Sequence, residues 1–291
     1  MSKGFKKILS IVLAIILVSS CFSMGVSAST LRKLDLAFVI DTTGSMSDDI
    51  DEVKRNMRAY LGDLDESRMN YRVAVVDYRD FPERTGYSGD YPYCVQLNFT
   101  SNYESILEAI NNLNLGNGGD VNETICSALI DGLSELSWRS DAGKAVILMG
   151  DAPALDPEPI TGYTKDMAIK KLLYNDTAYE EDLHARTALF SGALSGVTSM
   201  QDTQRSRVTL FAIATSSYSV SGFDYLATGT GGTSYVAGDS ADISDIIREI
   251  IDIIPDVVEE PTFWVRFRAF LLKVWWFISF QWGKIWPIDN K

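Results

Sequence analysis

The sequence predicts an α/β domain in which a doubly wound, mostly parallel sheet carries helices on both faces. Three observations favour this fold. Strand-like and helix-like segments alternate between residues 34 and 254, as they do where helices join parallel strands. Four strand-like segments are mostly apolar and do not alternate with polar residues, which is typical of strands buried on both faces. A fifth alternates in period 2 after a long polar loop, so we expect it to form one antiparallel edge strand.

These patterns place the strands and helices along the chain. The buried strands are expected at 34–40, 71–78, 145–150 and 208–214, the edge strand at 94–99 and a short last strand at 233–238. Helical patterns occupy 48–61, 103–113, 122–136, 164–173, 180–198 and 240–254. Asn102 and Ser240 are the expected caps of two helices, each with acids in or near the first turn. Pro255 is expected to end the last helix.

Residues 1–28 have the layout of a secretory signal peptide. Three lysines precede the apolar run ILSIVLAIILV, and the small residues VSA form a cleavage site. The apolar run is too short for a comfortable membrane span. We therefore expect cleavage after Ala28 and a protein that is secreted or held at the cell surface. An alternative interpretation takes VSSC as a loose lipoprotein box, with Cys21 as the lipidated residue.

Two cysteines, Cys94 and Cys126, remain after cleavage at Ala28. Export places them where disulfides persist, so one bridge between them is a candidate. Two free, partly buried thiols are the alternative, because a sequence does not fix the separation of two cysteines.

The composition changes sharply after the domain, which we expect to span 31–254 and to be followed by a linker at 255–262. The tail at 263–291 holds five of the six tryptophans. As a helix it would place its polar residues on one stripe and leave a wide aromatic and aliphatic face. The stripe consists of Arg266, Lys273, Gln281 and Lys284. Such a helix favours contact with a membrane interface or the cell envelope. Packing on the domain itself, or an oligomer contact, is the alternative. The contact residues are expected to be Trp264, Phe267, Phe270, Trp275, Trp276 and Trp282.

The chain is acidic, with a formal net charge of −13 at pH 7. Proteins that bind nucleic acid need a basic surface to meet the phosphates, so nucleic acid is excluded as a partner. An acidic surface is compatible with the binding of cations. Solubility of an exported protein also explains much of the charge.

Small oxygen-bearing side chains follow the first buried strand. Asp41, Thr43 and Ser45 occupy alternating positions in LAFVIDTTGSMS, so one loop can direct three oxygens toward a single point. The carboxyl ends of parallel strands are where open α/β sheets hold their ligands. Hard cations such as Mg²⁺ prefer oxygen ligands and keep several positions for water or substrate. A cap of Ser or Thr before the first helix is the alternative explanation of these residues.

Two further loops carry acids at comparable places. The glycine-rich segment GNGGDVNETI places Asp120 just before a helix, and AVILMGDAP ends a buried strand at Asp151. With the first loop they form a pattern that resembles a von Willebrand factor type A domain with its metal-ion-dependent adhesion site. The resemblance covers about residues 34–254. The segments VVDYRDFP, GDAPALDPEPITGYT and ATGTGGTSYVAGDSADI resemble bacterial exported members of that family.

The resemblance implies a divalent cation, Mg²⁺ with Mn²⁺ or Ca²⁺ as alternatives, and a protein partner whose carboxylate completes the coordination. Asp120 stands where the family's adhesion site has a threonine, and Thr124, one turn further on, is a second candidate ligand. The implied function is an exported adhesion or protein-binding module. An envelope-associated structural protein, in which the metal only stabilises the fold and the tail carries localisation, is the alternative. The implied ligands are Asp41, Thr43, Ser45, Asp120 and Asp151.

Enzyme classes with related motifs are disfavoured. A phosphatase of the haloacid-dehalogenase type needs a second Asp at the position of Thr43 as its acid and base. No GxxxxGK[ST], GxSxG or HExxH motif occurs in the sequence. The only histidine, His184, has no partner residue in its vicinity along the sequence, and we expect it to lie on the surface. These observations predict that the protein is not an enzyme.

Overall fold

A computed structural model describes residues 32–67, 69–119, 121–174 and 207–257. The leader, the helix expected at 180–198 with His184, most of the linker, the aromatic tail and Asp120 lie outside the described residues. No helix among the described residues has both the length and the apolar character that crossing a membrane requires.

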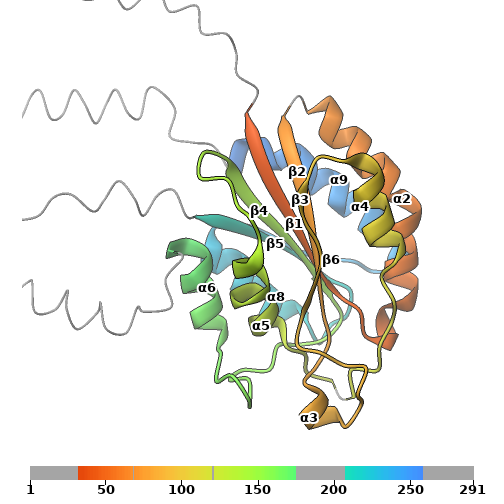
Figure 1. Cartoon of the computed structure of the whole chain (residues 1–291), viewed down its shortest axis with the longest axis vertical. Helices are drawn as coiled ribbons and strands as arrows, with labels where there is room; N and C mark the ends of the chain where they lie inside the picture. Colours follow the sequence, from red (N-terminus) through yellow and green to blue (C-terminus); the bar gives the residue numbers. More distant parts are fainter. Residues whose placement is uncertain (1–31, 68, 120, 175–206, 258–291) are drawn as a thin grey trace, which may run out of the picture. The chain divides into compact units, whose positions relative to one another are not determined.

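The strands form the mostly parallel sheet that the sequence predicts (Figure 1). Five strands run parallel, and β3 pairs antiparallel with β2 at the edge, as expected for the segment with period-2 alternation. The order across the sheet is β3-β2-β1-β4-β5-β6. The strands are β1 (Lys33–Asp41), β2 (Asn70–Tyr78), β3 (Cys94–Thr100), β4 (Gly143–Gly150), β5 (Val208–Ala214) and β6 (Ser234–Val236).

Helices cover both faces of this sheet (Figure 1). One face packs against α2 (Ser47–Glu66), α4 (Tyr103–Asn111) and α9 (Ser240–Val257), and the other against α5 (Ile125–Ile130), α6 (Lys165–Tyr174) and α8 (Val220–Thr230). Three short elements, η2 (Gly44–Met46), α3 (Pro82–Thr85) and η3 (Gly132–Glu135), lie in the connections. The central strands are buried on both sides, which explains why their sequences are apolar without alternation.

Three local expectations need correction. The helix expected at 122–136 is two pieces, α5 and η3, because the chain tightens into a 3₁₀ turn after Asp131. The helix α9 continues through Pro255 to Val257, since a proline this close to a helix end removes only one backbone bond. Ser240 is the first residue of α9, and Asp242 accepts the backbone N–H of Gly238 at 2.7 Å in its place. Asn102 does cap α4, through the N–H of Ser105.

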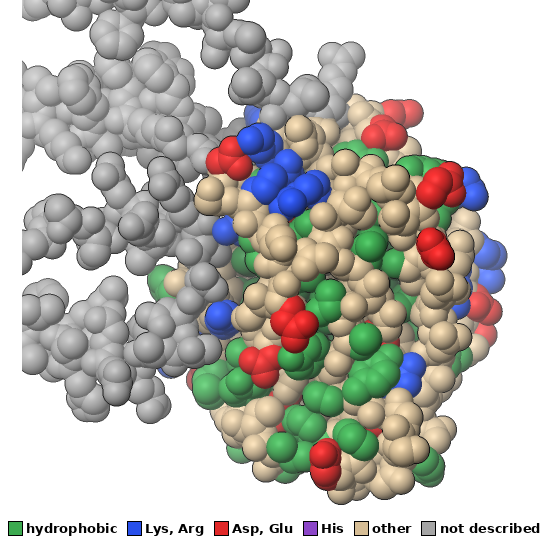
Figure 2. All heavy atoms as spheres, viewed as in Figure 1, with side chains coloured by type: hydrophobic (Ala, Val, Ile, Leu, Met, Phe, Trp, Pro, Cys, Tyr) green, Lys and Arg blue, Asp and Glu red, His purple; other side chains and the backbone are tan. Residues whose placement is uncertain are grey.

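A buried ion cluster joins the strands at the end of the sheet where β1 and β2 begin. The side chain of Asp35 is fully buried, and it accepts hydrogen bonds from the guanidinium groups of Arg72 and Arg139 at 2.7–2.9 Å. Figure 2 shows Arg and Lys side chains gathered at this end of the domain. The cluster satisfies a carboxylate that would otherwise be costly to bury.

Candidate metal centre

The strands β1 and β4 are neighbours at the point where the order of the sheet changes direction. The chain builds outward from β1 through β2 to β3, and then returns to the other side of β1 with β4. Ile40 pairs with Met149 in the last register position, so Asp41 lies beside Gly150, and Asp151 follows directly. Ligands of open α/β sheets bind at such switch points, beyond the carboxyl ends of the strands.

The first loop directs its oxygens toward one another as the sequence predicts. The Asp41 Oδ1 atom accepts hydrogen bonds from the Thr43 backbone N–H at 2.8 Å and from the Thr43 hydroxyl at 2.7 Å. The hydroxyl oxygens of Thr43 and Ser45 lie 3.3 Å apart. Asp41 and Thr43 are buried, whereas Ser45 is exposed. One carboxylate and two hydroxyls therefore converge at the rim of the sheet.

Burial makes the Asp41 carboxylate unfavourable without a positive partner. The pKa of Asp41 is raised to about 7, chiefly by this burial. The two hydrogen bonds from Thr43 lower the pKa, and the charges of Asp151 and Asp77 also raise it. Asp41 Oδ2 and Asp151 Oδ1 are both buried, and no donor within the described residues reaches either oxygen. Two carboxylate oxygens that lack donors are what a divalent cation would satisfy, so the residues present fit a metal.

Acids alone do not make up the site. In the part of the chain that the structure describes, no three His, Cys, Asp or Glu side chains come together as a ligand group. Within the described residues, the hydroxyls of Thr43 and Ser45 are the further oxygens beside Asp41 that could bind a cation. Water would fill other positions of a hard cation such as Mg²⁺, Mn²⁺ or Ca²⁺.

The glycine loop at 116–119 packs directly against the first loop. The Gly116 N–H donates to Thr42 O at 2.7 Å, and a Cβ on Gly118 would lie only 2.4 Å from Thr43 Cγ2. Gly118 has φ +71°, a conformation that favours glycine. Close packing and this conformation explain why glycines precede Asp120 in this loop.

Two residues that the sequence analysis did not single out hold the glycine loop in place. Asp90 Oδ1 accepts the backbone N–H groups of Asn117 and Gly118, each at 3.3 Å. The Arg79 guanidinium donates to Thr42 Oγ1 at 3.0 Å and to Asn114 O at 2.6 Å. Arg79 and Asp90 are almost completely buried. Both belong to the long polar connection between β2 and β3, which thereby buttresses the metal loops.

Comparison with known protein families agrees with this geometry. Residues 35–172 match the family model described as von Willebrand factor A domain. This match identifies residues 35–172 as a von Willebrand factor A domain. Members of this family are generally interaction modules rather than enzymes. No curated protein sequence matches the chain.

Several solved structures are similar to the domain at low sequence identity. Proximal thread matrix protein 1 from the mussel byssus is 14% identical, with a TM-score of 0.48 over 77% of this chain and 46% of that one. Another structure of that protein is described with a zinc-occupied MIDAS motif. The conserved hypothetical protein BatB from Bacteroides thetaiotaomicron is 11% identical, with a TM-score of 0.49 over 77% and 99% of the two chains. The chain thus spans about half the length of the mussel protein.

The remaining candidate residues of the von Willebrand factor A domain have other surroundings. The hydroxyl of Thr124 lies 2.8 Å from Arg79 O and 2.7 Å from Pro92 O, so it is engaged by backbone at the start of α5. Cys94 and Cys126 are free thiols in the structure, which matches the second of the two alternatives. Asp120 lies outside the described residues, between Gly119 and Val121.

Gly150 leaves room for the Asp41 side chain. A Cβ at this position would lie 2.4 Å from the Tyr78 hydroxyl oxygen and 3.2 Å from Asp41 Oδ2. We expect Gly150→Ala to lower the free energy of unfolding by about 1–3 kcal/mol, because both neighbours are buried and cannot move freely. Adding Tyr78→Phe should recover part of that loss, since it removes the clashing oxygen. Urea unfolding of the full chain in a double-mutant cycle measures the recovery. Equal losses with and without the Tyr78 hydroxyl would contradict the clash.

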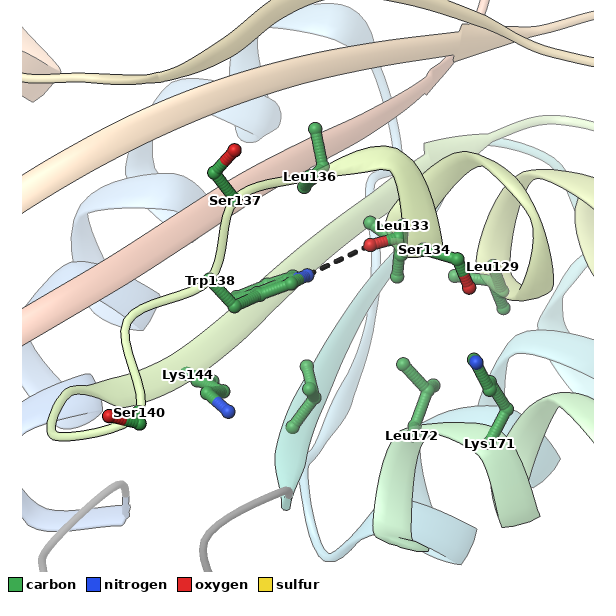
Figure 3. A pocket seen from close by; sticks show the side chains of 11 residues that line it. Leu129, Leu133, Ser134, Leu136, Ser137, Trp138, Ser140, Lys144, Lys171 and Leu172 are labelled. Carbon is green, nitrogen blue, oxygen red and sulfur yellow. Dashed lines mark hydrogen bonds between the residues drawn. The ribbon is translucent and has the colours of Figure 1, made fainter. Parts of the chain in front are cut away.

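A cavity of about 610 Å³ lies at the opposite end of β4, where β4 and β5 begin (Figure 3). The Trp138 ring lies along one side, held by a hydrogen bond from Nε1 to Leu133 O at 2.9 Å. Lys144 and Lys171 contribute the charged side chains of the lining, and no acid is among the lining residues. This cavity is therefore separate from the metal centre and adds no ligand to it.

Proposed function

We propose that the protein is an exported binding module that recognises a partner protein through a divalent cation. The cation would be held by Asp41 and Asp151 with the hydroxyls of Thr43 and Ser45, and Asp120 would contribute from the glycine loop. The observation that carries this proposal is that no donor among the described residues reaches the buried oxygens Asp41 Oδ2 and Asp151 Oδ1. Mg²⁺ is the proposed ion, with Mn²⁺ and Ca²⁺ as alternatives, because all three accept oxygen ligands.

The proposed mode of recognition is completion of the coordination by a carboxylate of the partner. Asp41 is fully buried, so its carboxylate lies inside the domain. Ser45 is exposed, so its hydroxyl lies on the solvent side of the site. An incoming Asp or Glu would reach the cation from that side. The charge of a cation between two carboxylates is partly neutralised, so the remaining attraction for a third carboxylate depends on how many acids bind the ion directly.

Immobilised peptides test this mode of recognition. Each peptide with a central Glu is paired with the same peptide carrying Gln, and the full chain is applied in Mg²⁺ or in EDTA. We expect retention on Glu peptides only, in Mg²⁺ only, and none for the Asp41→Asn chain. Retention that is equal on Glu and Gln peptides, or that survives EDTA, would refute recognition through the metal.

Localisation is part of the same proposal. The signal-peptide pattern supports export with Ser29 as the first residue of the mature chain, which N-terminal sequencing of the exported protein would show. The amphipathic pattern of residues 263–291 supports contact of the tail with a membrane or the cell envelope. Both segments lie outside the described residues, and flotation of the full chain with lipid vesicles tests the second.

A further inference from the structure

Glu123 is a third candidate for the metal centre in the segment that follows the glycine loop. The sequence analysis considered only Asp120 and Thr124 of this segment as ligands. Glu123 is almost completely buried, with 2% of its surface exposed. Its backbone is tied to the loop that follows Asp151, through Glu123 N–H to Pro153 O at 3.0 Å and Leu155 N–H to Glu123 O at 2.9 Å. These two bonds form an isolated parallel β-bridge between Glu123 and Ala154, which joins Glu123 to the loop after Asp151.

The carboxylate of Glu123 also reaches the first loop. The position that a Cβ on Gly118 would occupy is 2.8 Å from Glu123 Oε1 and 2.4 Å from Thr43 Cγ2. The side chains of Glu123 and Thr43 thus approach the same point beside Gly118. Glu123 is therefore joined by its backbone to the loop after Asp151, and its side chain approaches Thr43 of the first loop.

The neighbourhood of Tyr78 supports this placement. Burial raises the pKa of the Tyr78 hydroxyl well above its usual value, and the charges of Asp41, Glu123 and Asp151 raise it further. Three acids therefore act on the same buried hydroxyl. Two of them, Asp41 and Asp151, carry buried oxygens that no donor in the described part of the chain reaches, which points to a cation among them.

We propose that Glu123 is a positioning residue of the metal site, which holds a water molecule of the bound cation between the Thr43 and Asp151 loops. This inference rests on the proposed function. A role through water agrees with the finding that three acidic side chains in the described residues do not form a direct ligand group. It also agrees with the retained hydration of Mg²⁺. Acids that orient the ligands of a metal tune its affinity without binding it.

Glu158 provides a matched control, because it is a second buried glutamate on a loop beyond Asp151. Its side chain is 1% exposed, and its carboxylate accepts hydrogen bonds from Ser127 N–H at 2.8 Å and from the Thr161 hydroxyl at 2.6 Å. These bonds give the buried carboxylate of Glu158 hydrogen-bond partners, so its role is to stabilise the local structure. Replacing it removes a buried negative charge without touching Thr43 or Tyr78.

The experiment compares the unaltered full chain with Glu123→Gln and Glu158→Gln. Calorimetric titration with MgCl₂ or MnCl₂ gives the Kd, and the unfolding temperature in EDTA reports the stability of the metal-free fold. We expect Glu123→Gln to weaken the Kd about 10–100-fold without lowering the unfolding temperature in EDTA. Glu158→Gln should leave the Kd unchanged, whatever it does to stability.

Two other results would overturn the inference. A Kd of Glu123→Gln within twofold of the unaltered chain would overturn it while leaving the proposed function intact. If the unaltered chain binds neither ion, the proposed function fails as well. If Glu123→Gln does not fold, Glu123→Asp decides the matter, because it keeps the charge. It should then bind the ion with a Kd weakened by less than about tenfold. Complete loss of binding by a folded Glu123→Asp would overturn the role through water, because the charge is retained.

Discussion

Mg²⁺ is expected to leave the unfolding temperature of an Asp41→Asn chain unchanged, whereas the unaltered chain should gain stability as the ion is added. A site filled at about 100 times its Kd contributes about 2.7 kcal/mol to the free energy of unfolding. Asparagine keeps the Oδ1 atom that accepts the two hydrogen bonds from Thr43, but it lacks the charge that binds the cation. Thermal unfolding of the full chain with Mg²⁺, Mn²⁺, Ca²⁺ or EDTA provides the measurement.

In EDTA the same substitution should raise stability. The pKa of Asp41 is about 7 in the folded chain against 3.8 for an ordinary aspartate. The folded state therefore holds this proton more tightly than the unfolded state. The stabilisation is complete below pH 3.8 and is lost as the pH rises through about 7. The difference in the free energy of unfolding between the two chains should grow over that window to about 4 kcal/mol.

Asp141→Asn is the control for this experiment, because Asp141 is exposed and pairs with Lys33 at the other end of the sheet. Its response to Mg²⁺ should equal that of the unaltered chain. A rise in unfolding temperature with Mg²⁺ that Asp41→Asn shares in full would show that the ion binds elsewhere.

Asp35→Asn should affect stability and metal binding in the opposite way to Asp41→Asn. We expect a large loss of stability and no change in the affinity for Mg²⁺. The fully buried carboxylate is bonded to Arg72 and Arg139, and replacing one partner of such a cluster costs about 3 kcal/mol. Asp35 and Asp41 are six positions apart on β1, a distance of about 20 Å, so the metal loops should not be affected. Urea unfolding in EDTA measures the loss, and calorimetric titration measures the Kd.

Lys33→Ala is the comparison for Asp35→Asn. It breaks the ion pair with Asp141, whose two side chains are 40% and 60% exposed, so it should cost less than about 1 kcal/mol. If Asp35→Asn costs no more than Lys33→Ala, the ion cluster does not hold β1 in place. A weakened Kd for Mg²⁺ in Asp35→Asn would instead show that the two ends of β1 are energetically coupled.

The sequence predicted the sheet well because burial on both faces leaves a simple signature. The four apolar segments became parallel strands, and the alternating segment CVQLNF became the antiparallel edge strand β3. The division of the helix expected at 122–136 was not predictable, since it depends on how α5 meets the sheet. The same holds for Pro255, whose effect depends on its distance from the end of α9.

The convergence of the first loop was predictable because Asp41, Thr43 and Ser45 are close in sequence. The supports of the site were not, because their contacts join residues far apart in the chain. Asp90 reaches the backbone of Gly118 across 28 positions, and Arg79 reaches Asn114 across 35. The position of Glu123 beside Thr43 follows from the conformation of Gly118, which the spacing of residues does not reveal.

The neighbouring positions of Arg32 and Pro255 have a mechanical consequence. The Arg32 guanidinium donates to Pro255 O at 3.1 Å, so the chain enters and leaves the described domain at one place, where β1 begins. The metal loop lies at the other end of the same strand. A tensile force between a partner at the cation and a tether on either flank would therefore run along β1. That strand is paired along its length with β2 and β4, so its backbone bonds would be loaded in shear, all together rather than one after another.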